Sequence, residues 1–381
     1  MHRTYLDQGW SLGEDTLPKL RRNAPTGGWF PALQDLFWRI TKSNLSYIDL
    51  FLSPHLTKIS ISTSLSWRHS RVPYEILPAI SSTLSALPTS ALQSLWVSPL
   101  ISGAVLRDPL SSVVLRCGPS LTEFISMVPL SDAAVDHLIR LPHLRTCRIE
   151  GPPPSYPPSH MPSVSPLTEL ALGKDAACEW LSLLNRLRAS SGVRESLKSL
   201  KLSSPTIDTS FASPIRIFRN LVDLSVGVFC DGGNGDDQCI FKLDNDNIAE
   251  LVMALSQLEF LLLGHPCSKN ACATTIACLL FISVHCVKLQ VLEVHFNTTD
   301  IVGDLKSVSD DPRFQELRSR PRCMLLRLDV YKTPLTLDGP GFEAVANGMI
   351  DIFPSLERCD GTAQNPDWEK LSERIVELRG V

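Results

Sequence analysis

A six-residue phrase, L-x-x-[apolar]-x-[apolar], recurs along nearly the whole chain. It begins at twelve leucines, the last of which opens a degraded copy, LERCDG: Leu33, Leu56, Leu92, Leu121, Leu144, Leu167, Leu197, Leu221, Leu258, Leu289, Leu325 and Leu356. The starts lie 23 to 37 residues apart, and the shorter spacings match leucine-rich repeat units of about 20–29 residues. A single copy of so loose a pattern carries no information, but twelve copies in 381 residues are typical of a repeat protein.

The phrase has the two-residue period of a β-strand. In LTELAL, Leu170 and Leu172 face one side of the strand, while Glu169 and Ala171 face the other. One such strand cannot bury its leucines alone. Parallel copies stacked side by side would bury them in a continuous core.

Segments between the phrases have the pattern of helices. DNDNIAELVMALSQ offers Asp244 or Asp246 as an N-cap, and SDAAVDHLIRLP offers Ser131, each followed by apolar residues at helical spacing. DAACEWLSLLNRLRAS and GFEAVANGMIDIFP have the same pattern. The predicted fold is an α/β leucine-rich-repeat solenoid, a curved horseshoe with parallel strands on the concave face and helices and loops on the convex face. We expect an N-terminal flank at 1–28, about twelve irregular repeats at 29–361 and a C-terminal helical cap at 362–381.

Composition excludes several classes of protein. Hydrophobic residues at 44% and charged residues at 20% are globular values, and a net charge of −4 provides neither a nucleic-acid footprint nor a membrane-binding stripe. The N-terminus lacks the apolar core of a signal peptide. The longest apolar stretch, Ala271 to Val287, is interrupted by His285 and predicts a buried helix. Eleven irregularly spaced cysteines indicate reduced thiols. We therefore expect a soluble, monomeric protein of the cytoplasm or nucleus, with no nucleic-acid or membrane partner.

Motifs for catalysis or metal binding are not found in the sequence. HPCSKNACATTIACLLFISVHC lacks a C-x2-C pair, and Cys278 lies on an apolar helix, where a free cysteine behaves as a small hydrophobic residue. CDGGNGDDQC lacks the spacing of an EF-hand loop and is interpreted as an insertion between repeats. We expect no catalytic residues, no metal and no cofactor. The alternative from another class is a hydrolase or transferase whose site is built by loops.

Two segments can each be interpreted either as a binding motif or as a purely structural part of the repeats. GPPPSYPPSHMPSVSP contains the P-P-x-Y pattern that WW domains bind, at Pro153 to Tyr156, but an extended crossover between two strands explains it as well. VPYEILPAISSTLSALP, Val72 to Pro88, is similar to the opening of an F-box. An outer helix with Ile76, Ile80 and Leu84 facing inward explains that segment equally well.

Four phrases resemble a known family: FPALQDLFWRITKSNLSYIDLFLSPHLTKISI, VHFNTTDIVGDL, DPRFQELRSRPRC and GFEAVANGMIDIFPSLERCDG. They are similar to the leucine-rich regions of F-box proteins from mushroom-forming fungi, over most of the chain from Trp29 onward. The resemblance implies substrate recognition by the repeats. It also implies coupling through the F-box to a Skp-type adaptor and a cullin–RING ubiquitin ligase. Only 32 residues precede Leu33, and no F-box is recognised among them, so a free-standing or decaying repeat protein without ligase coupling is the alternative.

The strand register predicts which side chains face a partner. Outward positions of the twelve phrases include Asp35, Arg39, Lys58, Ser60, Ser94, Glu123, Ile125, Met127, Thr146, Glu150, Asp223, His295 and Asp329. The predicted protein-binding residues are Phe37, Trp96, Arg148, Glu169, Lys201, Phe260, Leu262, Glu293, Arg327 and Tyr331. Aromatic residues anchor protein interfaces, and charges of both signs along one face argue against a nucleic-acid groove. Trp96, Arg148 and Phe260 are the strongest candidates, and flanking segments could instead cover Phe37 and Tyr331.

Overall fold

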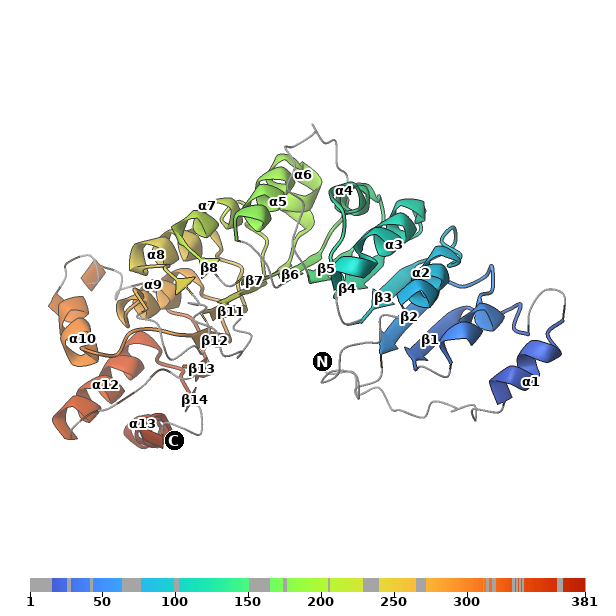
Figure 1. Cartoon of the computed structure of the whole chain (residues 1–381). Helices are drawn as coiled ribbons and strands as arrows, with labels where there is room; N and C mark the ends of the chain where they lie inside the picture. The colour runs from blue at the N-terminus through green and yellow to red at the C-terminus, as the bar shows by residue number, and fades with distance from the viewer. Residues whose placement is uncertain are drawn as a thin grey trace. The chain divides into compact units, whose positions relative to one another are not determined.

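The structure is a computed structural model, and it describes residues 16–25, 29–41, 44–63, 77–98, 103–150, 165–173, 177–204, 206–228, 240–264, 272–310, 312, 315, 316, 320–330, 333, 335, 337, 339–361 and 366–380. The chain divides into two compact units, Met1–Leu144 and Arg145–Val381. Each unit alternates parallel strands with helices, as Figure 1 shows, so the α/β class and the parallel strands predicted from the sequence are confirmed.

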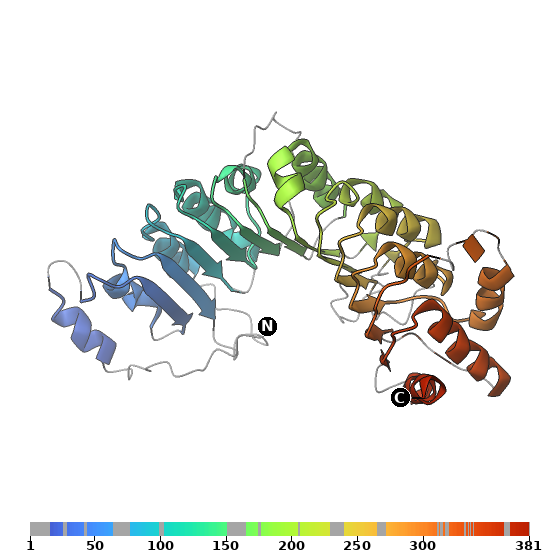
Figure 2. The same ribbon diagram turned by 180° about the vertical axis from the view of Figure 1, so that it is seen from behind.

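Unit 1 contains four strands that pair in chain order with parallel register: β1 (Asp35–Ile40), β2 (Lys58–Thr63), β3 (Ser94–Val97) and β4 (Glu123–Ser126). The accompanying helices are α1 (Thr16–Arg22), the 3-10 helix η1 (Leu45–Phe51), α2 (Leu77–Ser85), α3 (Gly103–Arg116) and α4 (Asp132–Arg140). The helices α2, α3 and α4 lie along one face of the strands, which both views show (Figure 1, Figure 2).

Unit 2 contains eight parallel strands paired in the order β5 (Thr146–Glu150), β6 (Glu169–Gly173), β7 (Ser199–Ser204), β9 (Asp223–Val228), β11 (Phe260–Leu263), β12 (Val291–Val294), β13 (Arg327–Asp329) and β14 (Arg358–Asp360). A separate two-stranded sheet joins β8 (Thr206–Ile207) and β10 (Ile240–Phe241). The helices are α5 (Ala177–Ala189), α6 (Ser191–Ser196), η4 (Thr209–Phe211), α7 (Ala212–Ile215), α8 (Asn245–Ala254), α9 (Ala277–His285), α10 (Ile301–Asp310), α12 (Gly339–Ile352) and α13 (Pro366–Arg379).

Each of the twelve sequence phrases ends in one of these strands, including the degraded copy, which forms β14. The first leucine of the phrase is fully buried in every copy except the first, where Leu33 is partly exposed. The two inward strand positions are buried as well, as in Leu170 and Leu172 of β6. The leucines therefore form the core that the two-residue period predicts.

Within each unit, one backbone carbonyl at every step from strand to strand accepts two hydrogen bonds from the next strand. The carbonyl of Gln93, for example, accepts from the N–H groups of Thr122 and Glu123 at 2.8 and 3.0 Å. The same double acceptance recurs at Gln34, Thr57, Arg145, Thr168, Lys198, Val222, Glu259, Gln290 and Leu326. A carbonyl oxygen has two lone pairs, so this arrangement satisfies two donors with one acceptor and fixes the register at the start of every strand.

The predicted helix starts are confirmed. Ser131 caps α4 by accepting from the N–H of Ala134, and Asp244 caps α8 in a capping box with Asn247. The Val72–Pro88 segment contains α2, in which Ile80 and Leu84 are buried, as expected of an outer helix, while Ile76 lies outside the described residues. The segments GPPPSYPPSHMPSV and CDGGNGDDQC also lie outside them.

Adjacent leucines on β11 provide a test of the register. We expect Leu261→Ala to lower the free energy of unfolding by about 2–5 kcal/mol, because Leu261 is fully buried. The matched change Leu262→Ala, on the partly exposed face, should cost about 1 kcal/mol or less. Urea denaturation measures both, and equal losses would contradict the assigned strand faces.

Candidate functional site

The strands carry one buried face and one partly exposed face, which we call the open face of each unit. On β3 and β4 the burial alternates between the two faces, with Ser94 and Trp96 partly exposed while Leu95 and Val97 are buried. Side chains on the open face therefore make up the candidate site.

The open face of unit 1 carries an apolar row that crosses the strands. The register aligns Phe37 with Ser60, Ser60 with Trp96 and Trp96 with Ile125. Phe37 is 63% exposed, an unusual value for an aromatic side chain on a strand, while Trp96 and Ile125 are half-buried. Met127, 37% exposed, follows directly after β4. The row is therefore a largely apolar strip about 14 Å long, taking neighbouring strands as roughly 4.8 Å apart, in which Ser60 separates Phe37 from Trp96 and Ile125.

A polar row borders this strip on the side where the strands begin. Asp35 aligns with Lys58, Lys58 with Ser94 and Ser94 with Glu123. The Lys58 ammonium lies 3.9 Å from the Asp35 carboxylate, and Ser94 Oγ donates to Glu123 Oε2 at 2.8 Å. An apolar centre with a polar border is the usual anatomy of a protein-binding surface.

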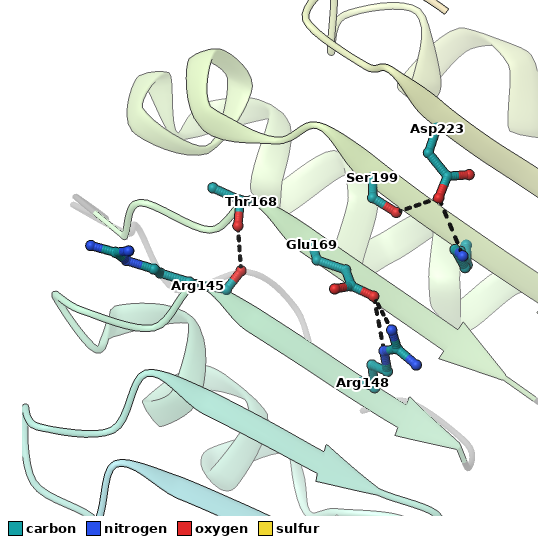
Figure 3. A network of polar contacts seen from close by, with 7 residues as sticks. Arg145, Arg148, Thr168, Glu169, Ser199 and Asp223 are labelled. Atoms are coloured by element: carbon teal, nitrogen blue, oxygen red, sulfur yellow. Dashed lines mark hydrogen bonds and ion pairs between the residues drawn. The ribbon is translucent and has the colours of Figure 1, made fainter. Parts of the chain in front are cut away.

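The open face of unit 2 is instead a ladder of ion pairs between neighbouring strands. Arg148 on β5 binds Glu169 on β6, with Nε 2.9 Å from Oε1. Lys201 on β7 lies 3.2 Å from Asp223 on β9, and Ser199 Oγ donates to the same carboxylate at 3.0 Å (Figure 3).

The ladder continues on the last two strands. Arg327 on β13 binds Asp360 on β14 at 2.9 Å and Asp329 of its own strand at 3.4 Å, while Arg358 also binds Asp360. The side chains of Arg327 and Arg358 are 51% and 70% exposed, and exposed ion pairs of this kind contribute about 0–1 kcal/mol each. Their value lies in the fixed pattern of charge on the surface.

The strands β11 and β12 interrupt the ladder. The register places Phe260 beside Val291 and Leu262 beside Glu293, all half-buried. An apolar window therefore opens between the Lys201–Asp223 pair on one side and the Arg327–Asp360 pair on the other.

Nine of the ten predicted binding residues lie on the open faces. Phe37 and Trp96 are in unit 1, and the seven from Arg148 to Arg327 are in unit 2. Tyr331 lies outside the described residues. The ion-pair partners Arg358 and Asp360 were missed because they sit in the degraded phrase, although its alternation marks them as outward positions.

His295 differs from its predicted place on the open face. It comes one residue after β12 and is only 8% exposed, with Nδ1 3.1 Å from Thr333 Oγ1. Trp368 of α13 donates to the Thr333 carbonyl at 2.8 Å and packs edge-on against Phe296. Gly264 has φ of +106° and leaves the room that a Cβ would take from His295. Contacts with Thr333, which α13 holds through Trp368, therefore bury His295 just after the end of β12.

The cysteines for which the structure gives burial and pairing are buried and free: Cys117, Cys147, Cys272, Cys278, Cys286, Cys323 and Cys359. Burial raises the pKa of Cys147, Cys286 and Cys359 to about 12, and that of Cys117 and Cys323 to about 11. These thiols are therefore protonated at neutral pH and are poor nucleophiles. Cys278 is fully buried in α9, as predicted for a position on an apolar helix.

Neither a metal centre nor a membrane-spanning helix is found in the described part of the chain. No group of three or more His, Cys, Asp or Glu side chains there could hold a metal ion. None of the helices seen there combines the length and the apolar character needed to cross a membrane.

The chain is similar to solved structures but not to any protein recognised by its sequence. No protein-family model matches the chain, and no curated protein matches its sequence. A chain in the crystal structure of the Rad7 and Elc1 complex in yeast is similar with a TM-score of 0.32 and 14% identity, over 92% of this chain and 79% of that chain. A similarity of this size fixes neither the fold nor the function.

We expect the buried cysteines to resist alkylation. At pH 8 the seven thiols should react with iodoacetamide orders of magnitude more slowly in the folded protein than in urea, because burial holds their pKa values high. Residue-resolved mass spectrometry measures each rate. Fast labelling of Cys147, which is fully buried, would contradict the packing of β5.

Burial of His295 predicts a loss of stability in acid. Burial lowers its pKa in the folded protein, so the unfolded chain binds the proton first as pH falls below the ordinary value of about 6.5. The free energy of unfolding should therefore fall between pH 7.5 and 5, and it should fall less in His295→Gln. His285, whose pKa burial also lowers, is present in both proteins, so the difference isolates His295. Identical pH dependence in urea denaturation would contradict the burial of this ring.

Proposed function

We propose that the chain is a leucine-rich-repeat solenoid, with its strands on the concave side, that binds another protein through the open faces without catalysing a reaction. The twelve strand-forming phrases and the parallel pairing within each unit support this architecture. Solenoids of stacked repeats commonly bind their partners on the strand-lined surface.

The exposed side chain of Phe37 is the observation that carries the proposal. Its position beside Ser60, in line with Trp96 and Ile125, makes it the exposed end of a row with three apolar side chains. Full burial of a phenylalanine contributes about 1.5–3 kcal/mol, and aromatic residues supply many of the energetically dominant contacts of interfaces. A partner that covers this row would gain binding energy that the isolated chain leaves unused.

The ion-pair ladder of unit 2 suits a role in specificity. Fixed charges reject partners with a mismatched pattern and contribute little to affinity while they remain exposed. The apolar window at Phe260 and Leu262 offers a second anchor between the charged pairs.

We assign this binding to the substrate-recognition role of an F-box type adaptor of a cullin–RING ubiquitin ligase, acting in the cytoplasm or nucleus. The resemblance of the phrases FPALQDLFWRI and GFEAVANGMIDIFPSLERCDG to leucine-rich regions of fungal F-box proteins supports the assignment. Coupling to a Skp-type adaptor is the part of the proposal that needs its own test.

Affinity enrichment with matched variants tests the binding face. We expect the wild-type chain to enrich at least one protein from an extract of its own cells, and Phe37→Asp to reduce that protein at least about tenfold, because a buried unpaired carboxylate costs more than 1.4 kcal/mol. Quantitative mass spectrometry provides the measurement. Phe37 is mostly exposed, so the variant should keep the wild-type melting temperature.

The control is Leu115→Asp, which places the same charge at a 46% exposed apolar position on α3. It should enrich the same proteins as the wild type. Identical enrichment by all three chains would overturn the assignment of the open face. Recovery of the Skp-type adaptor and cullin in the same experiment would support ligase coupling, and their absence beside a retained partner would leave a free-standing binding module.

A further inference from the structure

A shallow depression lies outside the open faces, in unit 2, between α6 and the turn that joins α7 to β9. Its volume is about 580 Å³, and its lining includes Arg194 and Glu195 of α6 together with Arg216, Arg219 and Asn220 of the turn. None of these residues belongs to a strand, so the depression is independent of the proposed protein-binding face. Its composition differs from that face, since three arginines surround one carboxylate.

Two contacts hold the walls of the depression in place. Arg216 binds Glu250 of α8, with Nη1 2.6 Å from Oε2, and this pair neutralises one guanidinium. Asn220 donates its side-chain amide to the carbonyl of Glu195 at 2.8 Å, which ties the turn to α6. The arginines are therefore presented by two elements, α6 and the turn, that are already joined before any ligand arrives.

The remaining two arginines have no partner within the part of the chain that the structure describes. The side chains of Arg194 and Arg219 are exposed and take part in no ion pair or hydrogen bond there. With Arg216 neutralised by Glu250, the charges of Arg194, Arg219 and Glu195 sum to +1. This excess of positive charge favours an anion such as a phosphate monoester, which carries about −1.5 to −2 at neutral pH. A guanidinium presents paired N–H donors that fit two phosphate oxygens at once.

We propose that this depression, lined by Arg194, Arg216 and Arg219, binds a phosphorylated segment of a protein. The volume exceeds what a free phosphate ion fills and falls in the range of sites that bind larger ligands, about 300–1,000 Å³. The depression therefore has room for residues on either side of a phosphate. A nucleic acid would bring many phosphates to a chain whose net charge is −4.

Two fluorescein-labelled heptapeptide pools test the site. The pools are randomised at every position except the centre, which is phosphoserine in one and serine in the other. In fluorescence anisotropy at about 0.15 M salt, the phosphoserine pool should bind the full chain at least about tenfold more tightly than the serine pool. The double variant Arg194→Ala/Arg219→Ala should reduce its binding to the level of the serine pool.

The control variant is Lys288→Ala/Lys306→Ala, which removes the same charge from two exposed lysines outside the depression. It should bind the phosphoserine pool as the wild type does, and so should Phe37→Asp, which separates this site from the open face. Equal binding of the two pools, or equal losses in the two double variants, would overturn the proposal. Tighter binding of a labelled single-stranded RNA that is lost with Arg194 and Arg219 would overturn the class of ligand.

Discussion

The doubly accepting carbonyl at the start of each strand is the constraint on which the rest of each unit depends. The oxygen of Lys198, for example, accepts from both Val222 and Asp223, so β9 can begin at only one register against β7. A slip of one residue would turn every inward leucine to the open face. The leucine at the start of the phrase, Leu221 in this repeat, is fully buried beside that junction. Hydrogen bonding and burial therefore select the same register. Only the first leucine and the inward positions of the phrase need to be apolar, and its outward positions can vary.

Because the inward leucines and the backbone carbonyls fix the fold, the side chains of the open faces can vary without changing it. Outward side chains contribute little to the core, so their chemistry differs between the units: an apolar row in unit 1 and an ion-pair ladder in unit 2. Exposed ion pairs add little stability, and Phe37, which is 63% exposed, buries only a minor part of its side chain. Features that stability does not require, yet which are built in register on neighbouring strands, are best explained by recognition of a partner.

The sequence predicted the features that are periodic or local, and it missed those that join distant segments. Leucine spacing identified the strands of the twelve phrases but not β8 and β10, and side-chain capping identified Ser131 and Asp244, because these signals lie within a few residues. The alternation also placed His295 outward. In the structure, Thr333, which follows it by 38 residues, contacts its ring, and Trp368, which follows it by 73 residues, donates to the Thr333 carbonyl. No local pattern contains these contacts. The cluster of Arg194, Arg216 and Arg219 escaped for the same reason, since helix α6 carries the first and a later turn carries the other two.

The two candidate sites rest on different physics, and this determines how each would respond to its surroundings. The apolar row of unit 1 would gain its energy from removing Phe37, Trp96 and Ile125 from water, an effect that salt screens weakly. The depression in unit 2 would gain its energy from exposed guanidinium groups, whose attraction to an anion falls as ionic strength rises and exists only while the ligand carries phosphate. A partner that used both surfaces would thus bind the apolar row whether or not it is phosphorylated, and would bind the depression only while it is phosphorylated. Phosphorylation of that partner would then change its affinity without any change in the open face.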